Sequence, residues 1–291
     1  MPDNPIATSA VASDLVLYAA CMPAAPFRDY VSAAAGAGFD AVTIWPLMYR
    51  RALSREGLTA ADMKQLVADA GLKFLDLDPI GSWLPNPDSG DDTSPGFRSV
   101  WTRQEFFDCA EALGLESLVA VHLGSGEVEP EVAIEGFAEL CDDAAEHGLK
   151  VGLEFMPFSG IPDLDAALHI VETADRANGG YVFDLWHLHR SGGGRADLAR
   201  LPLDRVFCVQ FSDGPVDAPA DLLDEAMWNR LEPGTGSFDL AGDLRALAEA
   251  GLSTRVGPEA FRKGFSEREP RVVARDLMAA TRNVLGLDPL D

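Results

Sequence analysis

The stretch AAEHGLKVGLEF, residues 144–155, contains the pattern that decides the fold: an alanine-rich helical end, a glycine and a short apolar run. Glycine suits the middle position because helices often end on a residue in the left-handed conformation, which glycine adopts without a Cβ clash. The apolar run lacks polar alternation, as expected of a parallel strand buried on both faces. The same pattern returns at residues 33–45, 66–77, 109–123 and 246–259.

Extended over the chain, this pattern predicts eight strands, at residues 15–20, 41–45, 73–77, 117–123, 150–155, 181–184, 205–211 and 254–259. Helical patterns separate and follow them, at residues 27–36, 59–70, 102–113, 131–147, 163–176, 194–200, 239–250 and 267–285. Strict alternation of this kind predicts an α/β chain folded as one (β/α)8 TIM barrel. An open doubly wound sheet is the alternative, and it is disfavoured because no GxGxxG follows the first strand. We expect the barrel to span residues 15–291, after a flexible N-terminal tail at residues 1–14.

Composition narrows the classes of partner. The chain has 23 Lys and Arg residues against 47 Asp and Glu residues, a formal charge of −24, which disfavours a nucleic-acid partner. No run of 18 apolar residues predicts a membrane span, and residues 1–14 lack the basic and apolar regions of a signal peptide. The four cysteines form no CxxC pair, so they do not indicate a disulfide framework. Cys109 and Cys141 lie in helical patterns and are expected to be small buried residues. We expect a cytoplasmic protein with a small-molecule substrate, and we leave open a homo-oligomer.

Polar side chains end four consecutive predicted strands: Glu154, Asp184, Gln210 and Glu259. The C-terminal ends of barrel strands converge on one mouth, so we expect these side chains to lie together. Three carboxylates at one point repel each other unless a cation neutralises them. Three carboxylate oxygens and one amide oxygen suit a hard divalent ion, so we predict one Mg²⁺ or Mn²⁺.

Histidines and arginines near the predicted mouth are candidates for catalysis and substrate binding. His187 lies three residues beyond Asp184, on the segment leaving the same strand end, which suits a general base with a pKa near the working pH. A packed core histidine is the alternative reading. Weaker candidates for substrate contact are His122, His189, Arg190 and Arg262.

Two long stretches follow predicted strands, at residues 79–101 and 212–238. Both are expected over the mouth, where such loops usually form lids or substrate walls. Their aromatic residues could close a pocket or simply hold the loops down: Trp83, Phe97, Trp101 and Trp228.

Several of these motifs together resemble the sugar phosphate isomerase/epimerase group of xylose-isomerase-like TIM barrels. The matching stretches are GLEFMPF (152–158), YVFDLWHLHRSGG (181–193), CVQFSDGP (208–215), LEPGTGSFDL (231–240) and VGPEAF (256–261). The resemblance implies a divalent metal held by Glu154, Asp184, Gln210 and Glu259, with catalytic roles for Glu154 and Glu259 beside His187. It does not specify a substrate.

Two departures bear on the reaction. The family's ketose 3-epimerases carry His at the third ligand and a second Glu six residues after the first, where this chain has Gln210 and Gly160. The ligand set is more similar to that of 3-dehydroshikimate and keto-inositol dehydratases. The endonuclease IV branch needs more histidines for its three zinc ions, and a non-catalytic sugar-binding barrel is disfavoured because all four ligands and His187 are present.

The leading hypothesis is enolisation, the removal of a proton next to the carbonyl of a small polyhydroxylated keto substrate. Reprotonation would give isomerisation or epimerisation, and loss of a β-hydroxyl would give dehydration. A metal-dependent phosphodiesterase is the alternative from another class.

Overall fold

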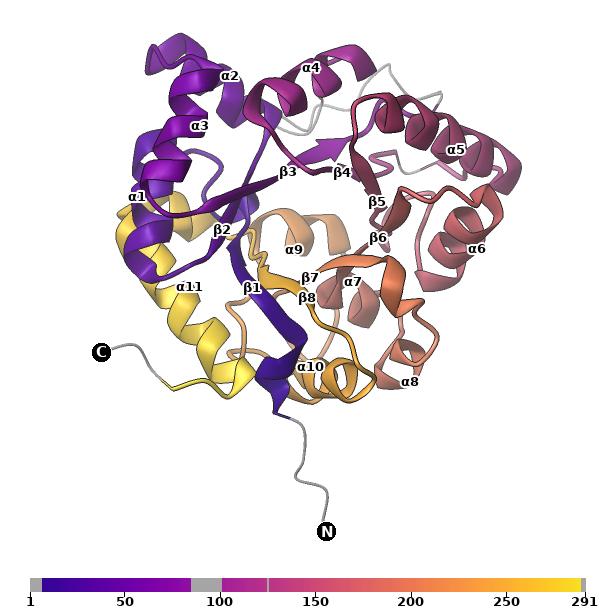
Figure 1. Ribbon diagram of the computed structural model, residues 1–291. Helices are drawn as coiled ribbons and strands as arrows, with labels where there is room; N and C mark the ends of the chain where they lie inside the picture. Colours follow the sequence, from indigo (N-terminus) through magenta and orange to yellow (C-terminus); the bar gives the residue numbers. More distant parts are fainter. Residues whose placement is uncertain (1–6, 85–100, 125, 289–291) are drawn as a thin grey trace.

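Eight parallel strands hydrogen-bond in sequence order and close on themselves, since β8 pairs with both β7 and β1 (Figure 1). This computed structural model describes residues 7–84, 101–124 and 126–288. The strands are β1 (Ala12–Leu17), β2 (Ala41–Ile44), β3 (Lys73–Ile80), β4 (Ser117–Ala120), β5 (Lys150–Leu153), β6 (Gly179–Asp184), β7 (Val206–Phe211) and β8 (Thr254–Pro258). The predicted (β/α)8 barrel is confirmed.

Helices surround the barrel, and each predicted helix has a counterpart (Figure 1). These are α1 (Phe27–Ala37), α3 (Ala60–Asp69), α4 (Arg103–Leu113), α5 (Pro130–Glu146), α6 (Leu164–Ala174), α8 (Arg195–Leu198), α10 (Leu240–Glu249) and α11 (Pro270–Leu285). Three further helices were not predicted: α2 (Pro46–Arg55), α7 (Leu185–Arg190) and α9 (Leu222–Trp228). All three lie in the segments that leave the C-terminal ends of strands, where the glycine-marked pattern gives no signal.

Local sequence signals fix many helix ends. The five glycines of the repeated pattern all have positive φ: Gly38, Gly71, Gly114, Gly148 and Gly251. Gly38, for example, closes α1 in the left-handed conformation, where its N–H bonds to carbonyls of the last turn. Thr59 and Thr102 begin α3 and α4 with capping boxes, in which the threonine hydroxyl accepts a backbone N–H and an acidic residue bonds back.

Inward and outward side chains of the strands belong to different apolar clusters. On β1, Leu15 and Leu17 pack toward the helices, whereas Val16 belongs to a separate cluster with Val119 and Val182. Alternation of side chains along a strand explains this division, which leaves the second cluster inside the barrel. The interior also holds a polar group: Asp76 accepts hydrogen bonds from Ser117 and Arg255.

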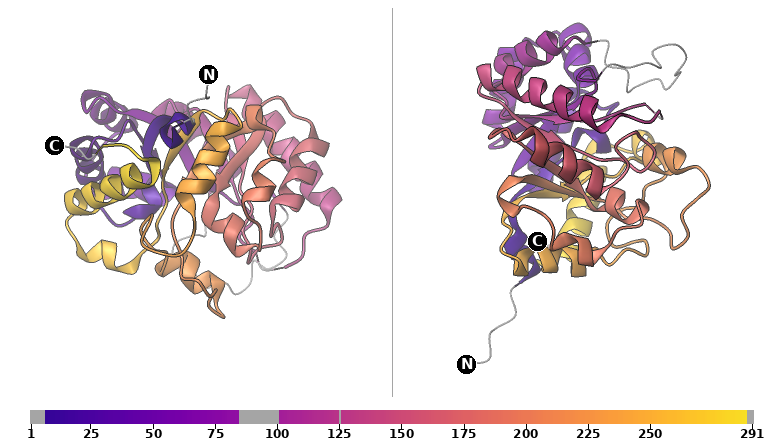
Figure 2. Two further views of the ribbon diagram at one scale, coloured as in Figure 1. Left: turned by 90° about the horizontal axis from the view of Figure 1, so that it is seen from below. Right: turned by 90° about the vertical axis from the view of Figure 1, so that its right-hand side faces the viewer.

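The barrel begins earlier than expected. Residues Thr8–Val11 form a 3-10 turn and β1 starts at Ala12, so the described part of the expected tail is ordered, and only residues 1–6 lie outside the description. The stretch 79–101 falls largely outside the described residues, Phe97 included; Trp83 and Trp101 are buried. The stretch 212–238 carries α9 and stands out from one end of the barrel (Figure 2). Nowhere in the described ranges is a helix long and apolar enough to cross a membrane.

A substitution at Gly257 tests how closely β8 must approach β1 for the barrel to close. A Cβ at this position would overlap the Val16 carbonyl oxygen, so Gly257→Ala must push the two strands apart. We expect a loss of about 1–3 kcal/mol in the free energy of unfolding, measured by chemical denaturation. Gly36→Ala is the control, because Gly36 lies inside α1 with open space around it; it should stabilise by about 0.5–1 kcal/mol. Equal effects of the two changes would contradict this account of closure.

Candidate functional site

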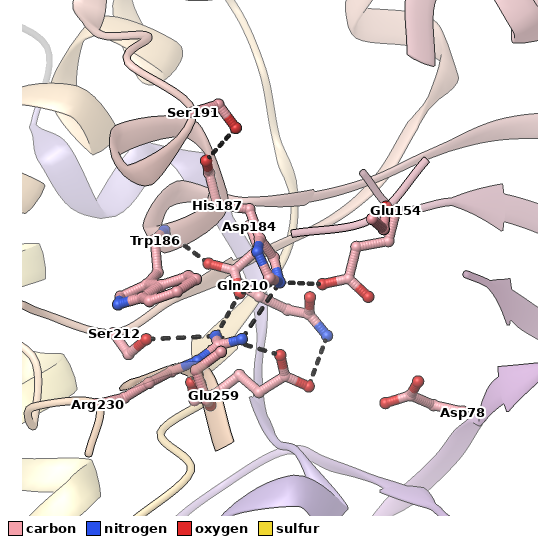
Figure 3. A network of polar contacts seen from close by, with 12 residues as sticks. Asp78, Glu154, Asp184, Trp186, His187, Ser191, Gln210, Ser212, Arg230 and Glu259 are labelled. Carbon is pink, nitrogen blue, oxygen red and sulfur yellow. Dashed lines mark hydrogen bonds and ion pairs between the residues drawn. The ribbon is translucent and has the colours of Figure 1, made fainter. Parts of the chain in front are cut away.

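Four polar side chains from neighbouring strands converge at the C-terminal mouth (Figure 3). Glu154 directly follows β5, Asp184 ends β6, Gln210 lies in β7 and Glu259 directly follows β8. Each is at most 6% exposed. Strand register explains the convergence, since Asp184 is paired with Gln210 and the Glu259 N–H bonds to the Phe211 carbonyl. The structure thus brings together all four of the predicted metal ligands.

Gln210 is oriented by one of its neighbours. Its amide nitrogen Nε2 donates to Glu259 Oε1 at 3.1 Å. Its amide oxygen Oε1 is buried and has no hydrogen-bond partner among the residues that the structure describes. A buried carbonyl-type oxygen without a donor costs free energy, so this orientation fits an oxygen that receives a ligand or a cation.

Glu154, Asp184 and His187 form a tighter group. One ligand atom from each lies within 4.8 Å of the others, and all three side chains are buried. His187 Nε2 is 3.4 Å from Glu154 Oε1 and 3.6 Å from Asp184 Oδ2. His187 lies on α7 rather than on a loop, because Asp184 caps that helix by accepting the Trp186 N–H. The spacing of three residues therefore places Asp184 and His187 about one helical turn apart.

Arg230 is a member of the cluster that the sequence reasoning missed. Its Nη1 donates to Asp184 Oδ2 at 2.6 Å and lies 3.7 Å from Glu259 Oε2. Its Nη2 is 3.2 Å from His187 Nε2. A guanidinium can only donate, so Nε2 of His187 accepts and the ring proton resides on Nδ1. In the sequence, Arg230 lies just before the LEPG turn, and this was the one hint of its role. Nothing in the local pattern shows that its side chain reaches the strand ends.

The same arginine anchors the segment between β7 and α10. Its Nε donates to the Ala226 carbonyl, its backbone N–H bonds to the Phe261 carbonyl, and its guanidinium lies over the rings of Trp186 and Phe261. Buried Asp213 holds the far part of the segment by accepting backbone N–H groups of Gly214, Gly234 and Phe238. The predicted loop is therefore tied to the mouth at two points.

Burial and mutual repulsion shift the pKa values of the cluster. Burial, together with the charge of Asp184, raises the pKa of Glu154 to about 8, although Arg230 opposes the shift. Burial and the charge of Glu154 raise the pKa of Glu259 well above its usual range. Burial lowers the pKa of His187 to about 3, so its ring is neutral and the expectation of a pKa near the working pH is not met. The carboxyls share one guanidinium, and a divalent cation would relieve both their desolvation and their repulsion.

The donor set fits a divalent metal. Glu154, Asp184 and Glu259 supply carboxylate oxygens, and Gln210 supplies the buried amide oxygen that has no partner. Oxygen donors of this kind suit Mg²⁺ and Mn²⁺. The group of Glu154, Asp184 and His187 adds a nitrogen donor, which ions such as zinc accept more readily.

Asp78 is a second residue that the sequence reasoning missed. It lies on β3, is 5% exposed, and its Oδ2 accepts a hydrogen bond from Trp45 Nε1 at 3.2 Å. Figure 3 shows its carboxylate turned toward Gln210 and Glu259 from the other side of the cluster. The signal in the sequence was the alternation of Asp76 and Asp78 within an apolar strand, which places both side chains on the inner face.

His122 is buried beside Gly160. Its Nδ1 accepts the Gly160 N–H at 3.0 Å. A Cβ at Gly160 would overlap the Gly126 carbonyl oxygen and lie 3.0 Å from the His122 ring. The position at which the resembling 3-epimerases carry their second glutamate is thus closed to any side chain in this packing.

The remaining predicted substrate-binding residues lie outside the cluster. His189 Nε2 is 2.8 Å from Asp243 Oδ2 and its ring stacks on Phe238, while the Arg190 guanidinium pairs with Glu225. Arg262 is exposed on the segment after β8. A role for any of them in binding substrate stays a prediction.

Comparison with known proteins gives one family and several relatives. The family described as xylose isomerase-like TIM barrel matches residues 31–284. The chain is 29% identical to the 3-dehydroshikimate dehydratase of Pseudomonas aeruginosa over 251 residues, 85% of this chain and 38% of that protein. It is 32% identical to the inosose isomerase of Bacillus subtilis over 165 residues, 54% of this chain and 58% of that protein. The chain therefore spans less than two thirds of the length of these relatives.

Solved structures agree on the fold. The crystal structure of the IolI protein with a bound zinc atom superposes with a TM-score of 0.81 at 23% identity, covering 94% of this chain and 98% of that one. D-psicose 3-epimerase from Clostridium cellulolyticum H10 gives a TM-score of 0.68 at 15% identity, covering 94% of this chain and 99% of that one. At this identity the likeness shows the fold alone.

The raised pKa of Glu154 predicts how the stability of the chelated protein depends on pH. Stability that rests on the protonated carboxyl is full below the ordinary pKa of 4.5 and is lost as the pH rises through about 8. His187 acts in the opposite sense: its contribution is present above pH 6.5 and is lost as the pH falls toward 3. Between about pH 6.5 and 8.5 the carboxyl effect dominates, so the Tm in EDTA should fall by about 5 °C or more.

Thermal melting at the two pH values measures this effect. Mn²⁺ should remove most of the fall, because the cation stabilises the ionised carboxylates, and Glu154→Gln in EDTA should show a smaller fall than the wild type. The same Tm at both pH values in the chelated wild type would contradict the assignment of a buried, repelling cluster.

Proposed function

Because the chain belongs to the xylose isomerase-like TIM barrel family, we propose that it is a divalent-metal-dependent enzyme that abstracts the proton next to a carbonyl group. The substrate is a small polyhydroxylated ketone, and the products are those of isomerisation or epimerisation, or of dehydration. One observation carries the proposal: three buried carboxylates, an amide oxygen without a partner and a neutral histidine meet at the C-terminal mouth. Active sites of barrels of this kind form at that end.

Glu154, Asp184, Gln210 and Glu259 are the proposed metal ligands, with Mn²⁺ or Mg²⁺ as the preferred ion. When bound, the ion supplies Lewis-acid polarisation of the substrate carbonyl. Gln210 keeps its oxygen available because its nitrogen is held by Glu259. Arg230 offsets part of the carboxylate repulsion and keeps Asp184 in place.

His187 is the proposed proton acceptor. Its ring is neutral, and Nε2 is the nitrogen that bears the lone pair. Nε2 lies 3.4 Å from Glu154 Oε1 and 3.6 Å from Asp184 Oδ2. A proton taken up there is stabilised by the charge of Asp184, which opposes the lowering of the His187 pKa by burial.

The geometry and the similarities favour dehydration or isomerisation over 3-epimerisation and phosphodiester hydrolysis. A 3-epimerase that uses a second glutamate is disfavoured, because position 160 has no room for a side chain. Dehydration is supported by the similarity to 3-dehydroshikimate dehydratase, and isomerisation by the similarity to inosose isomerase. A phosphodiesterase with three zinc ions is disfavoured, because His187 is the one histidine in the group of clustered metal-binding side chains found in the described chain.

Metal titration tests the ligand set. We expect calorimetry on EDTA-treated protein to give about one Mn²⁺ per chain, and Glu154→Gln to weaken binding by at least about tenfold, because it removes one of three charged donors. Asp243→Asn is the matched control: Asp243 is equally buried beside a histidine, but it lies outside the cluster. Tight Mn²⁺ binding by a Glu154→Ala, Glu259→Ala double variant would overturn the site.

Proton exchange tests the first chemical step, whichever product forms afterwards. Inosose and 3-dehydroshikimate incubated in D₂O with the Mn²⁺-loaded enzyme should lose the NMR signal of the proton next to the ketone. His187→Asn should slow this exchange by about 10²–10⁴-fold while metal content and Tm stay near wild type. A packed core histidine would instead give a lower Tm and a normal rate per folded molecule.

The same spectra separate the products. New olefinic signals indicate dehydration, whereas a rearranged set of ring signals indicates isomerisation or epimerisation. Metal-independent exchange, or none with any ketone tested, would overturn the proposed function.

A further inference from the structure

Asp78 faces the cluster from the opposite wall of the barrel. In a ring of eight strands in sequence order, β3 stands across from β7, which carries Gln210. Figure 3 shows the Asp78 carboxylate directed toward Gln210 and Glu259, with no interaction joining it to either. A ligand held at the cluster would therefore have this carboxyl on its far side.

The two inward acids of β3 differ in their partners. Asp76, one layer deeper, is bonded to Arg255 and Ser117, which account for its burial. Within the described residues, Asp78 has no ion pair, and its one hydrogen bond is from Trp45 Nε1 to Oδ2. Its Oδ1 receives no donor from the described chain, and it is not among the fully buried side-chain atoms that lack a partner. A donor that arrives with a ligand can therefore reach this oxygen.

The charge around Asp78 limits what that ligand can be. Within the described cluster, the four carboxyl groups of Asp78, Glu154, Asp184 and Glu259 face one guanidinium, that of Arg230. Arg230 and a divalent ion would together bring three positive charges to these four groups, so no positive charge is left over to hold the carboxylate of a substrate. A hydroxyl of a neutral substrate can instead donate a hydrogen bond to the Asp78 carboxyl.

We propose that Asp78 determines substrate specificity by receiving a hydroxyl on the far side of the substrate, so that the site prefers a neutral polyhydroxylated ring over a ring that carries a carboxylate. Trp45 positions the carboxyl through Oδ2 and leaves Oδ1 for the substrate. This inference rests on the proposed function for the location of the reacting carbonyl, and it adds the class of substrate.

Two non-reacting rings test the preference. Calorimetry on the Mn²⁺-loaded full chain should show that the neutral ring myo-inositol binds at least about tenfold more tightly than the anionic ring quinate. Asp78→Asn should weaken myo-inositol binding by about tenfold and reduce the difference in affinity between myo-inositol and quinate. It should weaken Mn²⁺ binding less than Glu154→Gln does, because Asp78 is not one of the proposed ligands. Asp78→Ala should change the affinity for each ring in the same direction as Asp78→Asn does.

Asp76→Asn is the matched control on the same strand. It should lower the Tm, because it breaks the bond to Arg255, and it should leave the affinity for both rings unchanged. A loss of myo-inositol affinity as large as that of Asp78→Asn would show that the effect is structural and would overturn the inference.

Kinetics with the two ketones completes the test. If exchange occurs, Asp78→Asn should raise the KM for inosose by about tenfold with kcat within about threefold, since the residue binds and does not transfer protons. A wild type that favours quinate and 3-dehydroshikimate, or an Asp78→Asn variant that binds like wild type, would overturn the inference and leave the proposed reaction standing. Absence of exchange with selective binding retained would instead overturn the reaction and leave the specificity assignment standing.

Discussion

Repulsion between buried carboxylates is the constraint on which the rest of this mouth depends. Glu154, Asp184 and Glu259 are brought together by strands whose own apolar packing fixes their positions, so the acids cannot move apart. Two buried groups offset part of this repulsion: the guanidinium of Arg230, which pairs with Asp184, and the amide of Gln210, which donates a hydrogen bond to Glu259. A cation at this point would relieve the remaining repulsion, and the neutral ring of His187 follows from the same burial.

The fold could be predicted from the sequence because its signals are local. Glycine ends a helix, and an uninterrupted apolar run follows as a strand, so the strand order needed no distant information. The four strand-end ligand candidates followed from topology alone. Helix α7 was missed because Asp184 begins it directly at the strand end, and the early start of β1 was missed because ASD, residues 12–14, reads as polar.

Arg230 and Asp78 could not be placed in the same way, because each depends on a contact distant in sequence. Arg230 reaches Asp184 from 46 residues away by way of α9, and Trp45 meets Asp78 across 33 residues. For Gly160 the sequence shows that the second glutamate is missing, but it does not show why. The structure gives the reason: the Gly126 carbonyl and the His122 ring leave no room for a side chain there. The similarity to both a dehydratase and an isomerase agrees with the proposed reaction, in which the first proton transfer is common to both outcomes.

Arg230 has two roles at once: its guanidinium pairs with the buried carboxylates, and it anchors the segment between β7 and α10. A cation held at Asp184 and Glu259 would compete with the guanidinium for the same oxygens. Binding of such an ion and anchoring of the β7–α10 segment would then be thermodynamically linked, and each would change the other by the same free energy. The residues that would hold an ion at the mouth are thus the same residues that hold its wall in place.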